Sequence, residues 1–146
     1  MNDIIKYLKD HTLTISLAES MTGGSLAYEF VKIAGVSEVF KGSLVCYQND
    51  IKVNVLKVPQ DLIDTCGVVS QEVVLDMAKK ALALFQSDVS LSVTGYAEAN
   101  KDIFISCKTQ SAHIVKHLIF DMGDRLEIIK KTVQAMIKLC KETLID

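Results

Sequence analysis

The sequence LTISLAESMTGG, residues 13–24, predicts a β-strand that runs directly into a glycine-containing turn and then into a helix. Apolar and polar side chains alternate along residues 13–18, as they do in strands. After Gly23 and Gly24, apolar side chains recur on one helical face until Gly35, which is expected to end the helix. Because a strand that leads into a helix is the repeating unit of α/β proteins, this stretch sets the fold class.

The remaining chain continues this pattern after a short amphipathic helix at residues 4–8. Strands are predicted at residues 39–47 and 89–95, with helices between them that begin at Asn49 or Asp50, at Pro59 and at Ser70. A hairpin of residues 103–107 and 113–120 precedes a long final helix that starts at Asp124, or beside it at Gly123. Its apolar face is expected to hold Leu126, Ile129, Val133, Met136, Ile137, Cys140 and Leu144. This order predicts a three-layer α/β/α sandwich with a mixed β-sheet, folded as one domain over residues 1–146.

Composition and charge narrow the class of protein. Hydrophobic residues make up 49% and charged residues 23%, which is typical of a globular chain with a core. The net charge of −2 argues against nucleic-acid binding through phosphate neutralisation. No apolar run approaches the ~20 residues of a membrane-spanning helix, and the N-terminus lacks the features of a signal peptide. The cysteines lack metal-ligand spacing, so we expect no metal, reduced thiols and a cytoplasmic location, with Cys46 and Cys107 buried.

The turn at residues 19–24 is the candidate site. Ser20 is expected at the carboxyl edge of the sheet, where α/β proteins bind ligands, and Thr22 adds a second hydroxyl. The following helix N-terminus offers free N–H groups and a partial positive charge, and Gly23 and Gly24 permit close approach of a ligand. These features suit an oxyanion or a phosphate. On its own the turn is equally explained as a simple helix cap, because serine and threonine are common there.

A nucleophilic serine needs a base, and the three histidines are poor candidates. His113 and His117 share one face of a predicted strand and are expected at the surface, while His11 lies in a turn that ends a helix. A desolvated lysine can take this role because burial lowers its pKa. Lys52 follows the strand at residues 39–47 and could reach a neighbouring strand end.

Five motifs follow one another along nearly the whole chain. They are AESMTGG at 18–24, Tyr47 with Asn49 and Lys52, GVVSQEV at 67–73, Val-Thr-Gly at 93–95 and Gly-Asp-Arg at 123–125. In this order they resemble the C-terminal domain of the competence/damage-inducible protein CinA, the nicotinamide-nucleotide amidase family also called PncC. The resemblance implies an α/β/α fold with a mixed sheet. It also implies hydrolysis of the amide of nicotinamide mononucleotide to the acid and ammonia, without a metal or other cofactor.

The resemblance also implies roles for individual residues. Ser20 would be the nucleophile and Lys52 its base, with Tyr47 assisting proton transfer or positioning Lys52. The helix N-terminus would stabilise the tetrahedral oxyanion. The substrate, a small-molecule nucleotide, would be bound by Thr22, Gly23, Gly24, Thr94, Gly95 and Arg125. Short sheet edges and an apolar final helix also favour a homo-oligomer.

One segment departs from the family pattern. Residues 96–102 replace its Gly-Pro-Gly-Gly loop by a shorter connection, and Met21 stands where the family often has cysteine. We expect a more open pocket, in which Glu98 adds a negative charge unfavourable to a phosphate. Two hypotheses therefore remain. The chain is an active amidohydrolase on nicotinamide mononucleotide or another small amide, or it is a degenerate relative that binds a ligand or partner with weak or no turnover.

Overall fold

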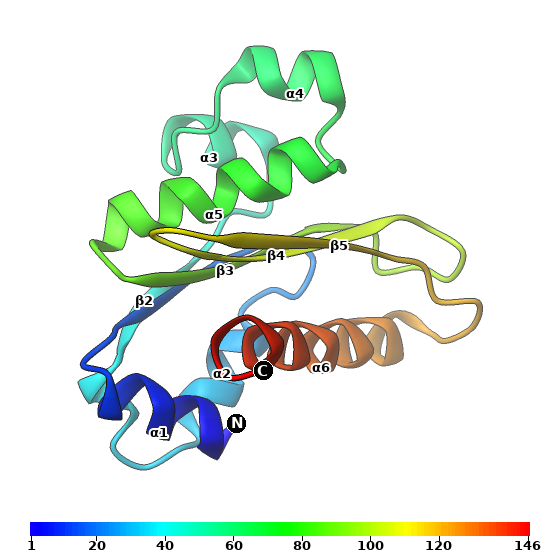
Figure 1. The fold of residues 1–146 in the computed structure, drawn as a ribbon. Coiled ribbons are helices and arrows are strands. Elements are labelled where there is room, and N and C mark those ends of the chain that lie inside the picture. Colours follow the sequence, from blue (N-terminus) through cyan, green and yellow to red (C-terminus); the bar gives the residue numbers. More distant parts are fainter.

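A five-stranded mixed sheet forms the middle layer of the molecule (Figure 1), and the computed structural model describes all residues 1–146. The strand order is β2-β1-β3-β4-β5. The strands are β1 (Ile15–Glu19), β2 (Phe40–Val45), β3 (Val89–Gly95), β4 (Ile103–Thr109) and β5 (His113–Leu118). Strand β1 pairs in parallel with β2 and β3, whereas β4 is antiparallel to both β3 and β5. The predicted mixed sheet is confirmed.

Helices cover both faces of this sheet (Figure 1). One layer contains α1 (Asn2–Asp10), α2 (Ser25–Val31) and α6 (Arg125–Leu144). The other contains α3 (Asn49–Asn54), α4 (Gln60–Cys66) and α5 (Gln71–Phe85). A short 3-10 helix, η1 (Val36–Glu38), leads into β2. The arrangement is the predicted α/β/α sandwich, and none of its helices has the length and apolar run needed to cross a membrane.

The two faces of the central strands carry side chains of different size. Leu17, Leu91 and Val93 belong to a cluster of 22 buried residues packed with α1, α2 and α6. Serines point the other way, toward α5, where the buried hydroxyls of Ser90 and Ser92 donate to Ala78 O at 2.7 Å and Val74 O at 2.6 Å. Small side chains let α5 lie close to the sheet, and their hydroxyls are satisfied by carbonyls of the helix itself.

Ser90 offers a test of this close packing. Ser90→Ala removes one buried hydrogen bond and is expected to lower the free energy of unfolding by about 1 kcal/mol. Ser90→Val also adds carbon atoms beneath α5, so we expect a total loss of about 2–4 kcal/mol. Urea unfolding followed by circular dichroism measures both changes. Equal effects of the two variants would show that α5 has room to move and would contradict tight packing.

Helix starts agree with the sequence more closely than buried faces do. The Ser70 hydroxyl caps α5 by accepting from Val73 N at 3.2 Å, and Asp124 caps α6 in a reciprocal pair with Glu127. The predicted inner face of α6 was partly wrong, because Leu126 is 77% exposed. The buried residues are Ile128, Thr132, Val133, Met136, Leu139 and Cys140. Leu126 instead borders a groove beside α2, which has only seven residues and is too short to cover this side of α6.

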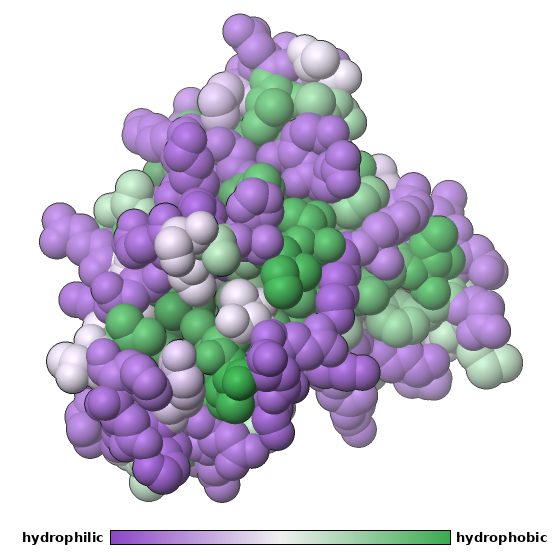
Figure 2. All heavy atoms as spheres, in the orientation of Figure 1, coloured by the Kyte–Doolittle hydropathy of each residue, from purple (hydrophilic) through white to green (hydrophobic).

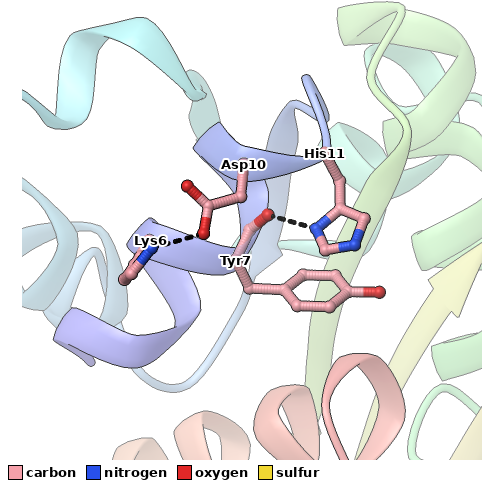
Figure 3. A network of polar contacts seen from close by, with 4 residues as sticks. All are labelled: Lys6, Tyr7, Asp10 and His11. Atoms are coloured by element: carbon pink, nitrogen blue, oxygen red, sulfur yellow. Dashed lines mark hydrogen bonds and ion pairs between the residues drawn. The ribbon is translucent and has the colours of Figure 1, made fainter.

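The outer parts of the molecule carry ordinary polar contacts. At the end of α1, His11 Nδ1 donates to Tyr7 O at 2.8 Å and the imidazole stacks on the Tyr7 ring, while Lys6 pairs with Asp10 (Figure 3).

In the same orientation as Figure 1, hydrophilic side chains cover most of the surface and separate smaller hydrophobic patches (Figure 2). Cys46 and Cys107 are buried free thiols, as predicted.

Candidate functional site

Ser20 lies where the ends of three parallel strands meet. It follows β1 directly, and Cys46 N at the end of β2 donates to Glu19 O at 2.8 Å. On the other side β1 pairs with β3, whose last residues Thr94 and Gly95 border the same cavity as Ser20. The turn from β1 into α2 therefore holds the Ser20 hydroxyl at the carboxyl edge of the sheet, with 6% of the residue exposed.

The residue before Ser20 is a fully buried carboxylate with four hydrogen-bond donors. Glu19 Oε1 accepts from Thr22 Oγ1 at 2.8 Å and Leu26 N at 3.0 Å. Glu19 Oε2 accepts from Ala27 N at 3.1 Å and Ser43 Oγ at 2.8 Å. Four donors compensate the lost hydration of the charge, and the first turn of α2 supplies two of them. This carboxylate ties β1, β2 and α2 together around Ser20.

The position of Glu19 differs from the expectation that the turn at residues 19–24 binds an oxyanion or a phosphate. The sequence suggested that the N-terminus of α2 is open to a substrate oxyanion. In the structure the Glu19 carboxylate already occupies this helix end. The Thr22 hydroxyl points at Glu19 and is not part of the cavity wall. Gly23 and Gly24 also lie outside the wall, and their positive φ angles of 60° and 98° show that they shape the turn instead. The structure thus places Thr22, Gly23 and Gly24, the predicted cradle, in the turn and outside the cavity wall.

We expect Glu19→Gln to lower the free energy of unfolding by at least about 2 kcal/mol, because an amide nitrogen cannot accept the hydrogen bonds made to one carboxylate oxygen. Glu19→Ala should cost more, since it leaves four donors without an acceptor. Urea unfolding measures both. Glu38→Gln is the matched control: Glu38 forms an exposed ion pair with Lys9 and should change stability by less than about 1 kcal/mol. A Glu19→Gln effect no larger than that of the control would contradict the structural role.

Lys52 approaches Ser20 from α3, the helix that follows β2. The residue is only 2% exposed, and its Nζ lies 3.0 Å from Ser20 Oγ. Two backbone carbonyls complete its surroundings, Cys46 O at 2.8 Å and Tyr47 O at 3.2 Å. No carboxylate pairs with it. Burial therefore lowers the pKa of Lys52 below its usual range, with the nearby Cys46 acting weakly in the opposite direction.

The three partners of Lys52 fix the direction of its hydrogen bonds once it is neutral. A neutral amine has two N–H donors and one lone pair. The carbonyls of Cys46 and Tyr47 can only accept, so both N–H groups point at them. The lone pair is then left for the Ser20 hydroxyl, which donates its proton to Nζ. This is the arrangement that a general base needs in order to activate a serine.

The low pKa can be measured without any activity. As the pH rises, Lys52 should lose its proton before the surface lysines do, because only its charged form is penalised by burial. NMR titration of the lysine side chains, with the Lys52 signal assigned by its loss in Lys52→Met, provides the measurement. If the Lys52 signal moves together with those of exposed lysines, the amine is not desolvated and the proposed base is excluded.

A cavity of about 260 Å³ opens beside the Ser20–Lys52 pair. Its wall contains the predicted residues Ser20, Tyr47, Lys52, Thr94, Gly95 and Arg125, together with Met21, Asn49, Val68, Val69, Tyr96, Ala97 and Glu98. Gly95 is required there, because a Cβ atom would lie 2.7 Å from Ile103 Cα on the neighbouring strand. The Thr94 hydroxyl donates to Val68 O at 2.9 Å and holds the loop before α5 against the end of β3.

Tyr47 meets Lys52 through its backbone and Arg125 through its side chain. Its carbonyl accepts from Lys52 Nζ, whereas its hydroxyl accepts from Arg125 Nη2 at 2.8 Å. Of the two roles that the resemblance implies for Tyr47, this geometry favours positioning. The hydroxyl holds Arg125, at the start of α6, against the end of β2, although the two residues are 78 positions apart.

The three histidines lie outside the cavity wall. His11 closes α1, His113 is exposed on β5, and His117 Nε2 contacts Asp102 Oδ1 at 2.7 Å. No group of three His, Cys, Asp or Glu side chains is arranged to hold a metal ion. Sequence reasoning placed Glu98 at the pocket but missed Glu19 and the wall residues Tyr96 and Ala97. Glu19 stood inside the quoted motif, whereas the wall carries no familiar pattern.

Comparison with known proteins identifies the family. The model of the family described as "CinA C-terminal domain" matches residues 1–144. The chain belongs to the CinA C-terminal domain family. A competence-damage inducible protein of Bacillus cytotoxicus is 36% identical over 89% of this chain and 33% of its own length. Another from Finegoldia magna is 44% identical over 64% of the chain and 23% of its own. The chain thus spans a quarter to a third of these curated relatives.

Solved structures of CinA proteins share the fold. The competence/damage inducible protein CihA from Agrobacterium tumefaciens is 31% identical, covers 94% of this chain and 88% of its own, and has a TM-score of 0.87. A CinA superfamily protein from Klebsiella pneumoniae has a TM-score of 0.91 at 22% identity, with coverage of 97% and 92%. At this low identity, the similarity to the Klebsiella pneumoniae protein shows a shared fold and nothing more.

Proposed function

We propose that this CinA domain is an amidohydrolase in which Ser20 attacks the amide and Lys52 is the general base. The observation that carries this proposal is the 3.0 Å separation of Lys52 Nζ and Ser20 Oγ at a buried amine whose other two contacts are backbone carbonyls. Nicotinamide mononucleotide is the substrate that the resemblance to the nicotinamide-nucleotide amidases suggests. Arg125 supports it, since its guanidinium uses one donor on Tyr47 and has others available for a phosphate.

The reaction needs two transfers through the same pair of side chains. Ser20 Oγ forms a bond to the amide carbon while its proton passes to Lys52 Nζ, which gives a tetrahedral oxyanion. The C–N bond then breaks, the Lys52 ammonium returns the proton to the leaving nitrogen, and ammonia departs from an acyl-serine ester. Water attacks this ester, Lys52 accepts the proton of the water, and the Ser20 oxygen leaves with that proton. Nucleotide acid and ammonia are the products, and both side chains return to their starting state.

The oxyanion has a donor other than the helix end. The backbone N–H groups of Met21 and Thr22 have no acceptor within the protein, and Met21 lies in the cavity wall beside Ser20. The N–H of the residue after a nucleophilic serine is a common oxyanion donor in α/β hydrolases. One such donor is worth about 2.7–4 kcal/mol in acyl-transfer enzymes. We therefore assign the oxyanion to the N–H of Met21.

Ser20→Ala is expected to lower ammonia release from nicotinamide mononucleotide by at least about 10³-fold, because the covalent step is lost. The small side chain contributes little to packing, so thermal unfolding should change little. Ser37→Ala, at an exposed serine in η1, is the matched control and should keep full activity. Lys52→Met should be as inactive as Ser20→Ala, since an unactivated hydroxyl is a weak nucleophile.

The outcomes separate the enzyme from a binding domain. Ammonia release that disappears in Ser20→Ala supports the amidohydrolase. Saturable nucleotide binding without release supports a degenerate domain that only binds its ligand. Ammonia release that persists in Ser20→Ala would show that another group does the chemistry and would overturn the mechanism.

A further inference from the structure

The cavity wall holds two basic side chains, Lys52 and Arg125, and one acidic side chain, Glu98, and the three differ in their partners. Lys52 makes three short contacts, and Arg125 donates to Tyr47. Glu98 accepts no hydrogen bond and forms no ion pair within the protein, although it lies in the wall of the same cavity. Its carboxylate is thus the one cavity charge left entirely to solvent and ligand.

A free carboxylate in a cavity wall selects among ligands by charge. A ligand that fills the cavity removes part of the hydration of Glu98, which costs free energy unless the ligand brings a positive charge or hydrogen-bond donors. An anionic group placed there would be repelled as well. Arg125, held by the Tyr47 hydroxyl, presents positive charge in the same cavity. The wall therefore carries both signs of charge, and a ligand with both a cationic and an anionic group can satisfy each of them.

Aromatic surface accompanies the carboxylate. Tyr96, two residues before Glu98, is 49% exposed, and Tyr47 is 54% exposed, and both belong to the cavity wall. Aromatic faces attract organic cations, and the attraction grows when the cation is weakly hydrated. A metal ion would need several oxygen or nitrogen ligands, whereas Glu98 is the only carboxylate in this wall. The combination favours a flat organic cation with delocalised charge.

We infer that Glu98, together with Tyr96, forms a subsite for a cationic ring in the cavity that holds the Ser20 nucleophile. This inference rests on the proposed function, because it concerns the part of the substrate that carries the amide. The sequence predicts that the short connection at residues 96–102 weakens substrate binding, whereas here it contributes to binding. This segment supplies a counter-charge for the ring, while Arg125 takes the anionic group of the same substrate.

The test compares two ligands that differ in ring charge. Oxidised nicotinamide mononucleotide carries a pyridinium cation, whereas its reduced form has a neutral dihydropyridine ring with the same phosphate, ribose and amide. Dissociation constants are measured by calorimetry on Ser20→Ala, which prevents turnover, with and without Glu98→Gln. We expect Ser20→Ala to bind the oxidised form about three- to tenfold more tightly than the reduced form. Glu98→Gln should bring this ratio close to one.

The ratio matters more than either affinity, because Glu98→Gln also removes repulsion of the phosphate that both ligands share. Asp121→Asn is the matched control: it changes the net charge equally, Asp121 does not line the cavity, and the ratio should stay unchanged. If neither mononucleotide binds, the cation 1-methylnicotinamide is titrated against uncharged nicotinamide by NMR. A preference for the cation that Glu98→Gln abolishes supports the subsite.

Three results would overturn it: a ratio that Glu98→Gln leaves unchanged, a ratio that Asp121→Asn lowers equally, or no preference for either cation. Failure of the amidase proposal looks different, because it is the absence of Ser20-dependent ammonia release from the unmodified chain. A cation subsite can therefore be present in a protein that does not hydrolyse amides, and an active amidase can lack it.

Discussion

The structure depends on an amine that is buried without a counter-charge. Lys52 Nζ touches one hydroxyl and two carbonyl oxygens, and no carboxylate pairs with it. Such a position disfavours the ammonium ion, because the carbonyl dipoles replace only part of the lost hydration. The Cys46 and Tyr47 carbonyls lie at the end of β2, and the sheet register fixes that end beside Glu19 and Ser20. The position of Lys52 relative to the serine is therefore set by backbone pairing, not by a flexible loop.

Glu19 and Lys52 are both neighbours of Ser20, the first in the chain and the second through a hydrogen bond. They show two ways of burying an ionisable group. Glu19 receives four donors, including two N–H groups of α2, which support its negative charge. Lys52 receives no such support for a positive charge. The first arrangement makes a rigid joint between β1, β2 and α2, and the second suits the general base that we propose. A carboxylate placed beside Lys52 would have stabilised the ammonium ion and removed its basicity near neutral pH.

The strand and helix order was predictable because it follows local patterns. The alternation of valine or leucine with serine or threonine along residues 89–94 defines β3, and Ser70 and Asp124 start their helices through hydrogen bonds to residues three positions away. Interactions distant in sequence were harder to predict. The inner face of α6 depends on how short α2 is, and the contact of Tyr47 with Arg125 joins residues 78 positions apart. No periodicity encodes either feature.

The candidate site shows the same division. The convergence of Ser20 and Lys52 was expected from the family motifs, whereas the expected substrate cradle of Thr22, Gly23 and Gly24 lies outside the cavity wall. This difference has a physical cause, since a sequence shows that a helix N-terminus can bind an anion but not that Glu19 already fills it. Residues 96–102 were interpreted as a shortened loop that leaves the pocket open, with Glu98 at it, and the structure shows that Tyr96 and Ala97 wall the cavity as well.

In the proposed reaction, chemistry and substrate selection use separate parts of this fold. Ser20 and Lys52 are held by β1, β2 and the helices that follow them, and none of their hydrogen bonds involves residues 96–102. That connection joins β3 to β4 and touches the reaction only through the cavity wall. It can therefore shorten, lose glycines or gain a charge without moving the nucleophile away from its base. A change there is expected to alter which amide fits and how tightly it binds, while the proton transfer between Ser20 and Lys52 keeps its geometry.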